Sequence, residues 1–370
     1  MILGAAILGR LGSATLASTG SAFGMPEQAS TLAPQVDRIY DIINWICGFF
    51  FVVIVGVMLY FMFKYRRREH VADTGGPTHN TLLEVTWTII PLILVIAIFY
   101  VGLEGYVKIR TPPQNAYVIE VIGTRWSWAF NYPNGAKLAT PNDPLLVPVN
   151  RPVKLLMRSN DVIHSMFLPA FRVKQDVVPG RFTHLWFEAT KEGKFPLYCA
   201  EYCGTQHSQM TGTVEVLGKY EFEERIDIEA KWMDKVPDEN LHLAGTLIYN
   251  QCGLCHTLDG SALIGPSFKE THELFKSGGS RRLADGRSEP VTEAYLRKSI
   301  LEPLAQIARN HQTDKAYPSS MTPGIGDQLG PRRVDAMIRM IMRLDEVTDD
   351  EWNLIPVNRA DIVVEDSEDE

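Results

Sequence analysis

Two long stretches of the chain carry no charged side chain. They cover residues 42–63 and residues 85–103, which are 22 and 19 residues long. At a rise of about 1.5 Å per residue, a helix of either length crosses roughly 30 Å of hydrocarbon. The alternative is a pair of buried core helices, but no nearby segment is amphipathic enough to cover them. The pattern therefore predicts a transmembrane hairpin over residues 35–110.

The loop between the two spans is basic, with the sequence Lys64-Tyr65-Arg66-Arg67-Arg68. Lys and Arg next to a span favour the cytoplasmic side. We therefore expect the N-terminus and everything after residue 104 on the periplasmic side of a bacterial inner membrane. Residues 1–24 end in small residues and are typical of a signal peptide, although Met25 is an alternative start.

Behind the hairpin the polarity pattern changes twice. Over residues 113–220, short alternating runs are separated by Pro, Gly and Asn, as in NYPNG and TPNDP, which predicts an antiparallel sandwich or barrel. A charged linker at 221–240 leads to a region at 241–347 that begins with a helix, and an acidic tail follows at 348–370. The chain thus reads as a multidomain protein.

The net charge over all 370 residues is −8, which argues against nucleic acid as the main partner. Residues 237–370 contain 14 Lys and Arg against 23 Asp and Glu, a net of −9, so residues 1–236 carry the remaining +1. The acidity therefore belongs to the last part of the chain.

One loop in the predicted β region combines several soft metal ligands. Cys199 and Cys203 are followed by His207 and Met210, and His164 precedes them by 35 residues. Thiolate, thioether and imidazole together select copper, and His with Cys and a weak Met is typical of electron-transfer copper. Two thiols four residues apart are able to bridge two coppers. The alternative is a Cys199–Cys203 disulfide, which leaves the other three residues unexplained.

The predicted helical region contains Cys252-Gly-Leu-Cys255-His256, and C-x-x-C-H is the attachment motif of c-type haem. The alternatives are a thioredoxin-like redox pair, which lacks its βαβ context, and half of a zinc site, which lacks partner ligands. For the second iron ligand we expect Met321, in a loop shaped by Gly and Pro. Its rivals Met337, Met340 and Met342 follow a helical period and are predicted to pack.

Residues 35–220, with the motif C-x-E-x-C-x-x-x-H-x-x-M, resemble subunit II of the haem-copper cytochrome c oxidases. The resemblance implies a cupredoxin-like Greek-key β-barrel that holds the dinuclear CuA centre. It implies bridging thiolates from Cys199 and Cys203, terminal imidazoles from His164 and His207, the Met210 thioether on one copper and the Glu201 carbonyl on the other.

The same resemblance implies three further roles. The Glu201 carboxylate and Asp176 would bind magnesium shared with subunit I. Trp126 would be the aromatic residue through which electrons reach the copper centre, although a plain core tryptophan is the alternative. Glu84 would stand at the entrance of a proton-uptake path, although a solvated carboxylate at a helix end is the alternative.

The region from CHTLDG to Met321 is similar to the small all-α class I cytochrome c domains fused to caa-type oxidase subunits. That similarity implies that the carbonyl of Pro266 accepts a hydrogen bond from the second nitrogen of His256. Two departures stand out: Met321 is followed by Thr322 and then Pro323, and the spacing of Gly245 and Tyr249 before the first cysteine is one residue short.

Together these features predict the electron-transfer subunit of a respiratory terminal oxidase. Electrons would come from a cytochrome c or a bc-type complex, pass through haem c and CuA, and reach subunit I, where oxygen is reduced to water with coupled proton translocation. Subunit III and membrane lipid are further expected partners. The alternatives are a nitric oxide reductase, a quinol oxidase subunit and a stand-alone tethered carrier. The quinol oxidase is disfavoured because all the copper ligands are present, and the tethered carrier because Asn44 and Glu84 in a membrane favour protein neighbours.

The acidic C-terminal part leads to a first prediction. It attracts a basic electron donor, and salt screens this attraction. Turnover with a basic cytochrome c should therefore slow as ionic strength rises, which steady-state oxygen consumption measures. A flat salt response would remove the idea.

Overall fold

The computed structural model describes residues 24–66, 79–318, 321, 325–357 and 359–363. The expected signal peptide up to residue 23, Arg67 and Arg68 of the basic loop, Thr322 and Pro323, and the last seven residues of the acidic tail lie outside the described residues. The chain divides into two compact units. One comprises Met1–Thr111 with Ala170–Arg172, and the other comprises Pro112–Pro169 with Val173–Glu370.

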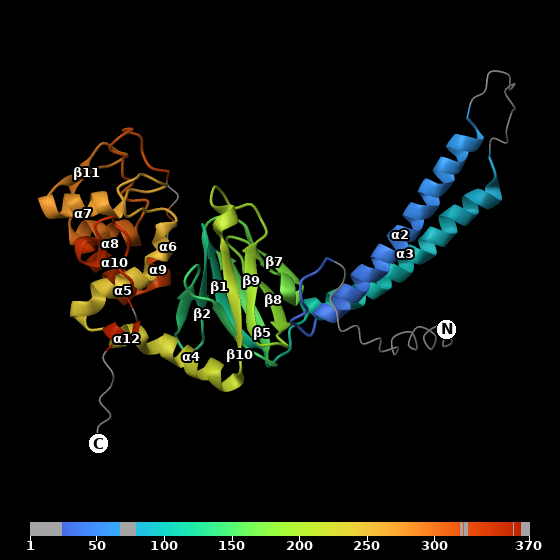
Figure 1. Cartoon of the computed structure of the whole chain (residues 1–370), viewed down its shortest axis with the longest axis horizontal. Coiled ribbons are helices and arrows are strands. Elements are labelled where there is room, and N and C mark those ends of the chain that lie inside the picture. Colours follow the sequence, from blue (N-terminus) through green and yellow to red (C-terminus); the bar gives the residue numbers. More distant parts are fainter. Residues whose placement is uncertain (1–23, 67–78, 319–320, 322–324, 358, 364–370) are drawn as a thin grey trace. The chain divides into compact units, whose positions relative to one another are not determined.

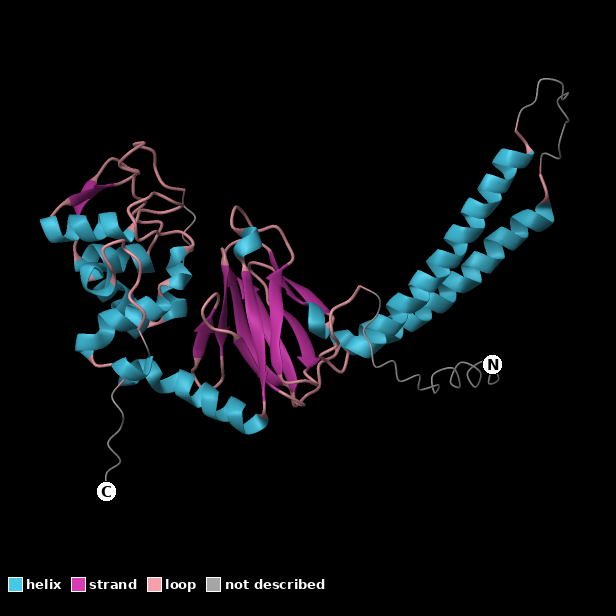
Figure 2. Cartoon of the chain, viewed as in Figure 1, coloured by secondary structure: helices cyan, strands magenta, loops and turns pink. Residues whose placement is uncertain are grey.

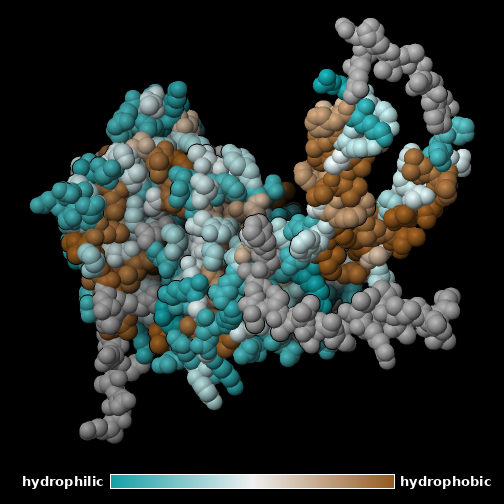
Figure 3. Space-filling view, turned by 45° about the vertical axis from the view of Figure 1, so that its right-hand side comes forward, coloured by the Kyte–Doolittle hydropathy of each residue, from teal (hydrophilic) through white to brown (hydrophobic). Residues whose placement is uncertain are grey.

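The first unit contains two long apolar helices, as predicted. Helix α2 spans Ala33–Lys64 and helix α3 spans Thr81–Arg110, so both extend beyond the uncharged stretches. The side chain of Asn80 caps α3 by accepting a hydrogen bond from the backbone N–H of Leu83 at 3.2 Å. Large apolar side chains on both helices face outward, with Trp45 81 % exposed (Figure 3). Such surfaces suit lipid as their solvent.

The second unit begins with two five-stranded sheets (Figure 2). The first has the order β3-β2-β1-β5-β8, with bounds Lys137–Ala139, Ser127–Asn131, Tyr117–Thr124, Pro152–Ser159 and Thr183–Glu188. The second has the order β4-β10-β9-β6-β7, with bounds Leu145–Pro148, Thr211–Leu217, Gly193–Cys199, His164–Leu168 and Val173–Val177. The short 3-10 turn η1 (Pro169–Phe171) lies between β6 and β7, and η2 (His207–Gln209) lies between β9 and β10.

Alternation of buried and exposed positions explains the strands, most regularly in β5, where every second residue is buried. Fully buried side chains such as Trp128 and Phe187 from the first sheet and Met166 from the second fill the interior. The expectation of an antiparallel fold needs one correction, because β1 pairs with β5 in parallel, and so does β10 with β4. Both parallel pairs join strands that are distant in sequence, which local turn signals do not reveal.

The charged segment expected as a linker is largely helical. Helix α4 spans Lys219–Lys231 and is followed by the short turns η3 (Trp232–Lys235) and η4 (Asp238–Asn240). Phe222 and Ile226, one helical turn apart, are buried, and the Phe222 ring meets Tyr117 of β1 edge-on with centroids 5.5 Å apart. Because these two apolar side chains lie on one face of the helix, the charged segment packs against the β sheet through that face.

The C-terminal part is helical around one core (Figure 1). Its helices are α5 (Leu241–Ile248), α6 (Asn250–Gly253), α7 (Phe268–Ser277), α8 (Glu293–Leu301), α9 (Ile325–Leu329), α10 (Pro331–Met342), α11 (Leu344–Val347) and α12 (Arg359–Ile362). A small antiparallel pair, β11 (Ser280–Arg282) with β12 (Ser288–Pro290), departs from the all-α expectation. Figure 1 shows α5 alongside α10, so the first and one of the last helices close the core together.

Gly245 of α5 has no side chain, and this allows α5 to pack closely against α10. A Cβ atom there would lie 2.5 Å from the Ala336 carbonyl oxygen and 2.5 Å from Met340 Cβ. Gly245→Ala should therefore destabilise the helical part by about 1–3 kcal/mol. The loss of stability is measured by heating the full chain and following, by limited proteolysis, the temperature at which the helical part unfolds. Gly218→Ala is the control, because its Cβ would meet only the flexible end of Glu192, and equal effects of both changes would contradict the packing argument.

Candidate metal and cofactor sites

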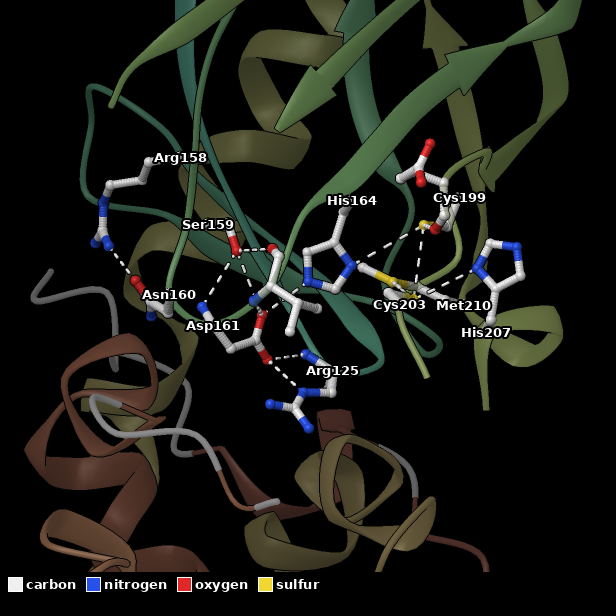
Figure 4. A network of polar contacts seen from close by, with 12 residues as sticks. Arg125, Arg158, Ser159, Asn160, Asp161, His164, Cys199, Cys203, His207 and Met210 are labelled. Atoms are coloured by element: carbon white, nitrogen blue, oxygen red, sulfur yellow. Dashed lines mark hydrogen bonds and ion pairs between the residues drawn. The ribbon is translucent and has the colours of Figure 1, made fainter. Parts of the chain in front are cut away.

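The second sheet and its connections bring the predicted metal ligands together (Figure 4). His164 starts β6, Cys199 ends β9, and Met210 directly precedes β10. Cys199 Sγ lies 3.8 Å from Cys203 Sγ and 4.0 Å from His164 Nδ1. Cys203 Sγ in turn lies 3.4 Å from His207 Nδ1 and 3.7 Å from Met210 Sδ. The predicted donors therefore converge on one cluster.

The two cysteines of this loop are free thiols. Their separation of 3.8 Å is far longer than a disulfide bond of about 2.05 Å. The carbonyl oxygen of Glu201 lies 3.2 Å from Cys199 Sγ, so a backbone oxygen also faces the sulfur pair. The arrangement is that of separate ligands and does not support the disulfide alternative.

The cluster favours an anionic sulfur. A hydrogen bond from Cys203 lowers the pKa of Cys199 to about 3, and further hydrogen bonds, including that of His164, outweigh the effect of burial. The pKa of Cys203 is raised, because losing its proton would place two thiolates side by side. Binding of a cation would relieve this repulsion, since thiolate is the metal-binding form of cysteine.

Asp161 holds the ring of His164 and was not anticipated from the sequence. Its Oδ1 lies 2.8 Å from His164 Nε2, which leaves Nδ1 turned toward Cys199. Burial raises the pKa of Asp161, but hydrogen bonds from His164 and from the backbone N–H groups of Arg125 and Val162 bring it down to about 2. An Asp three residues before a ligand His was the available signal, because ligand imidazoles usually donate their second N–H to such a group.

Trp126 lies beside the cysteine loop. Its side chain is buried, and a Cβ atom on Gly204 would come within 3.2 Å of the indole ring. Gly204 follows Cys203 directly, so the indole packs against the backbone next to a metal ligand.

The other carboxylates expected to be functional make hydrogen bonds of their own. Glu84 Oε1 accepts the backbone N–H of Asn80 at 3.3 Å and so helps to cap α3. Asp176 Oδ1 accepts the hydroxyl of Ser165 at 2.8 Å. Within the described part of the chain, the one group of three or more His, Cys, Asp or Glu donors close enough for a metal is His164, Cys199 and Cys203. Magnesium binding by Glu201 and Asp176 stays a prediction.

A second site lies in the helical part, at the end of α6. His256 Nδ1 donates to the carbonyl oxygen of Pro266 at 2.8 Å, the contact expected from the sequence. The ring stacks on Phe268 with centroids 4.9 Å apart, and Gly265 approaches it so closely that a Cβ there would lie 2.4 Å from Cε1. His256 lines a cavity, which continues over Cys252, Pro266, Tyr295, Ser299, Met321 and Ile325.

The thiols of this second site are neutral. Burial raises the pKa of Cys252 to about 12 and that of Cys255 to about 11. A thioredoxin-like pair would need a thiolate near neutral pH, so this alternative loses support. Burial likewise lowers the pKa of His256 despite the Pro266 carbonyl, and because Nδ1 donates to that carbonyl, Nε2 keeps a free lone pair.

Arg281 lines the same cavity and also escaped the sequence analysis. It is only 2 % exposed, and its Nη atoms donate to Glu270 at 2.6 Å and Thr271 at 3.0 Å. Its Nε has no hydrogen-bond partner in the described chain. A buried, unpaired donor beside a cavity calls for an acceptor from whatever fills the cavity.

Met321 and one of its rivals both border the cavity. Met340 belongs to the buried helical core and Met342 packs against it, as expected from their helical period. Met337 is buried in the same core but also lines the cavity together with Met321. Two methionines, Met321 and Met337, therefore border the cavity that His256 lines.

Known proteins are similar to about the first two thirds of the chain. Residues 18–104 match the family model "Cytochrome C oxidase subunit II, transmembrane domain", and residues 134–217 match "Cytochrome C oxidase subunit II, periplasmic domain". Cytochrome c oxidase subunit 2 of Alkalihalophilus pseudofirmus is 31 % identical over 250 residues, covering 64 % of this chain and 72 % of that protein. Its counterpart from Cereibacter sphaeroides is 27 % identical, covering 62 % and 88 %.

A solved structure, the periplasmic domain of subunit II of cytochrome oxidase of Bradyrhizobium japonicum, is 33 % identical and covers 33 % of this chain and 97 % of that one, with a TM-score of 0.31. Neither family match extends to the C-terminal helical part. The sequence relatives, in contrast, share most of their own length with this chain. On that ground the chain belongs to the family of cytochrome c oxidase subunit II, the membrane-bound subunit that passes electrons to subunit I and whose periplasmic domain implies a CuA centre.

Proposed function

We propose that this subunit carries electrons through two centres of its own, a covalent haem c followed by the dinuclear copper. The observation that carries the haem half is the hydrogen bond from His256 Nδ1 to the Pro266 carbonyl beside two free cysteines. It presents a neutral imidazole nitrogen to a cavity next to two thiols, as covalent haem attachment requires. The copper would then reduce subunit I, where oxygen becomes water with coupled proton translocation.

For the copper pair we assign bridging roles to Cys199 and Cys203 and terminal roles to His164 and His207. Met210 and the carbonyl of Glu201 complete the donor set. Support comes from the softness of these donors, from the anionic sulfur, and from the hydrogen bond of Asp161 that directs His164 Nδ1 inward. A pair of copper ions bound here would supply one-electron chemistry with little rearrangement of buried ligands.

For the haem we assign thioether links to Cys252 and Cys255 and iron ligation to His256 and Met321. A haem also carries two propionate carboxylates, and the unpaired Nε of Arg281 offers a buried cationic donor for one of them. The residues present therefore fit a haem in charge as well as in covalent chemistry.

The remaining assignments follow the family. Trp126 would connect the donor side to the copper, Glu84 would start a proton path, and Glu201 with Asp176 would bind magnesium at the subunit I interface. The partners would be subunits I and III and a cytochrome c or bc-type donor. A nitric oxide reductase and a stand-alone carrier are the competing functions. Membership in the oxidase family favours oxygen as the terminal acceptor over both.

Cys199→Ser should abolish the copper spectrum and turnover, because a hydroxyl does not replace a bridging thiolate. Metal analysis should fall from two coppers to none, while the covalent haem stays at one per chain. Cys47→Ser is the matched control, since Cys47 is an exposed thiol on α2 far along the sequence from the loop. Copper retained in Cys199→Ser would refute the assignment of the loop.

Met321→Leu should leave the haem covalently attached but lower its reduction potential, because loss of a methionine ligand removes a contribution that raises it. The absorption band of methionine-ligated ferric haem should vanish as well. Met337→Leu, a change of the same kind in the same cavity, should keep both properties. The reverse pattern would transfer the iron ligand to Met337, and no covalent haem in the unmodified chain would end the haem proposal.

A further inference from the structure

The turn between β1 and β2 touches both candidate sites. On one side the indole of Trp126 packs against Gly204 in the cysteine loop. On the other side Thr124, Arg125 and Ser127 line the same cavity as Cys255 and His256. Both sites belong to the same compact unit of the chain. Neighbouring residues of one turn thus reach the copper loop and the haem-binding segment.

Arg125 is held in place from the copper side. Its backbone N–H donates to Asp161 Oδ2 at 2.7 Å, and its Nε lies 3.4 Å from the same oxygen. The other oxygen of Asp161 lies 2.8 Å from His164 Nε2 (Figure 4). The side chain of Asp161 is 5 % exposed and that of Arg125 is 29 % exposed, so the pair is largely shielded from water. A continuous polar link therefore runs from a copper ligand to the guanidinium.

The side chain of Arg125 also reaches the helical part. It lines the cavity that contains Cys255, one of the two thiols to which the haem would be attached. The same cavity wall contains no other cationic residue from the β part among the described lining residues.

We propose that Arg125 is a positioning residue that holds the haem-binding segment against the copper loop, so that electrons pass between the two sites within this one chain. The inference rests on the proposed haem function. With both cofactors bound, the step would be a transfer of one electron, which the haem would lose and the copper pair would gain. No bond would form or break.

A different role for Arg125 has a different consequence. If it only orients Asp161, its loss disturbs the copper ligand His164 and hence the copper spectrum. If it positions the two sites, its loss leaves each centre intact and slows only the exchange of electrons between them, since tunnelling rates fall steeply with distance. The two roles therefore separate in one set of measurements.

The experiment uses the full chain with copper and haem bound, in detergent. A flash-generated reductant delivers a single electron to the haem, and its absorption band and that of the copper are followed in time. In Arg125→Gln the transfer should be roughly tenfold slower, with copper bands, haem content and both reduction potentials unchanged. Arg125→Lys should recover part of the rate, because it keeps the charge without the planar fork.

Arg158→Gln is the matched control. Arg158 belongs to the same polar network and pairs with Glu120 at 3.1 Å, but it does not line the cavity. It should transfer electrons at the unmodified rate. If Arg125→Gln keeps both centres and transfers electrons at the unmodified rate, the role of Arg125 is refuted but the proposed function is not. Loss of the copper bands in this variant would have the same meaning. Absence of covalent haem from the unmodified chain would instead overturn the proposed function, and this inference with it.

Discussion

The register of β6 against β9 is the constraint on which the copper site depends. Met166 pairs with Cys199, and the N–H of Ala200 donates to the carbonyl of Ser165 at 2.9 Å. These contacts place His164, from a distant part of the sequence, beside the cysteine loop. A slip of one residue would turn every side chain of β6 to the opposite face and remove the imidazole from the cluster. The ligand geometry is thus a property of the backbone pairing.

The two cysteine pairs of this chain show how surroundings decide the chemistry of identical side chains. Cys199 sits among hydrogen-bond donors, and its pKa falls to about 3. Cys252 is half-buried in a desolvated position without such donors, and its pKa rises to about 12. The first environment prepares a thiolate for a cation, while the second keeps a neutral thiol beside an apolar cavity. One chain therefore offers two kinds of sulfur.

Much of this organisation could be predicted from the sequence. Uncharged length alone reveals α2 and α3, and the spacing of Cys199, Cys203, His207 and Met210 reveals that these side chains cluster, because residues within one loop are local in sequence. Pairing between distant segments leaves no such local pattern. The parallel partners of β1 and β10, and the contacts of Arg125 and Arg281 with the cavity, therefore emerge only from the structure. Helix α4 escaped prediction for another reason, since its acidic composition concealed a single buried apolar pair.

The close packing of α5 against α10 at Gly245 has a consequence for biogenesis. The chain is made from its N-terminus, so α5 and the Cys252–His256 segment leave the translocation channel before α10 exists to pack against them. Until α10 arrives, the core of the helical part is incomplete and both thiols stay open to the periplasm. For the proposed haem, the order of synthesis would provide an interval in which an attachment enzyme reaches the thiols, and completion of the last helices would end it.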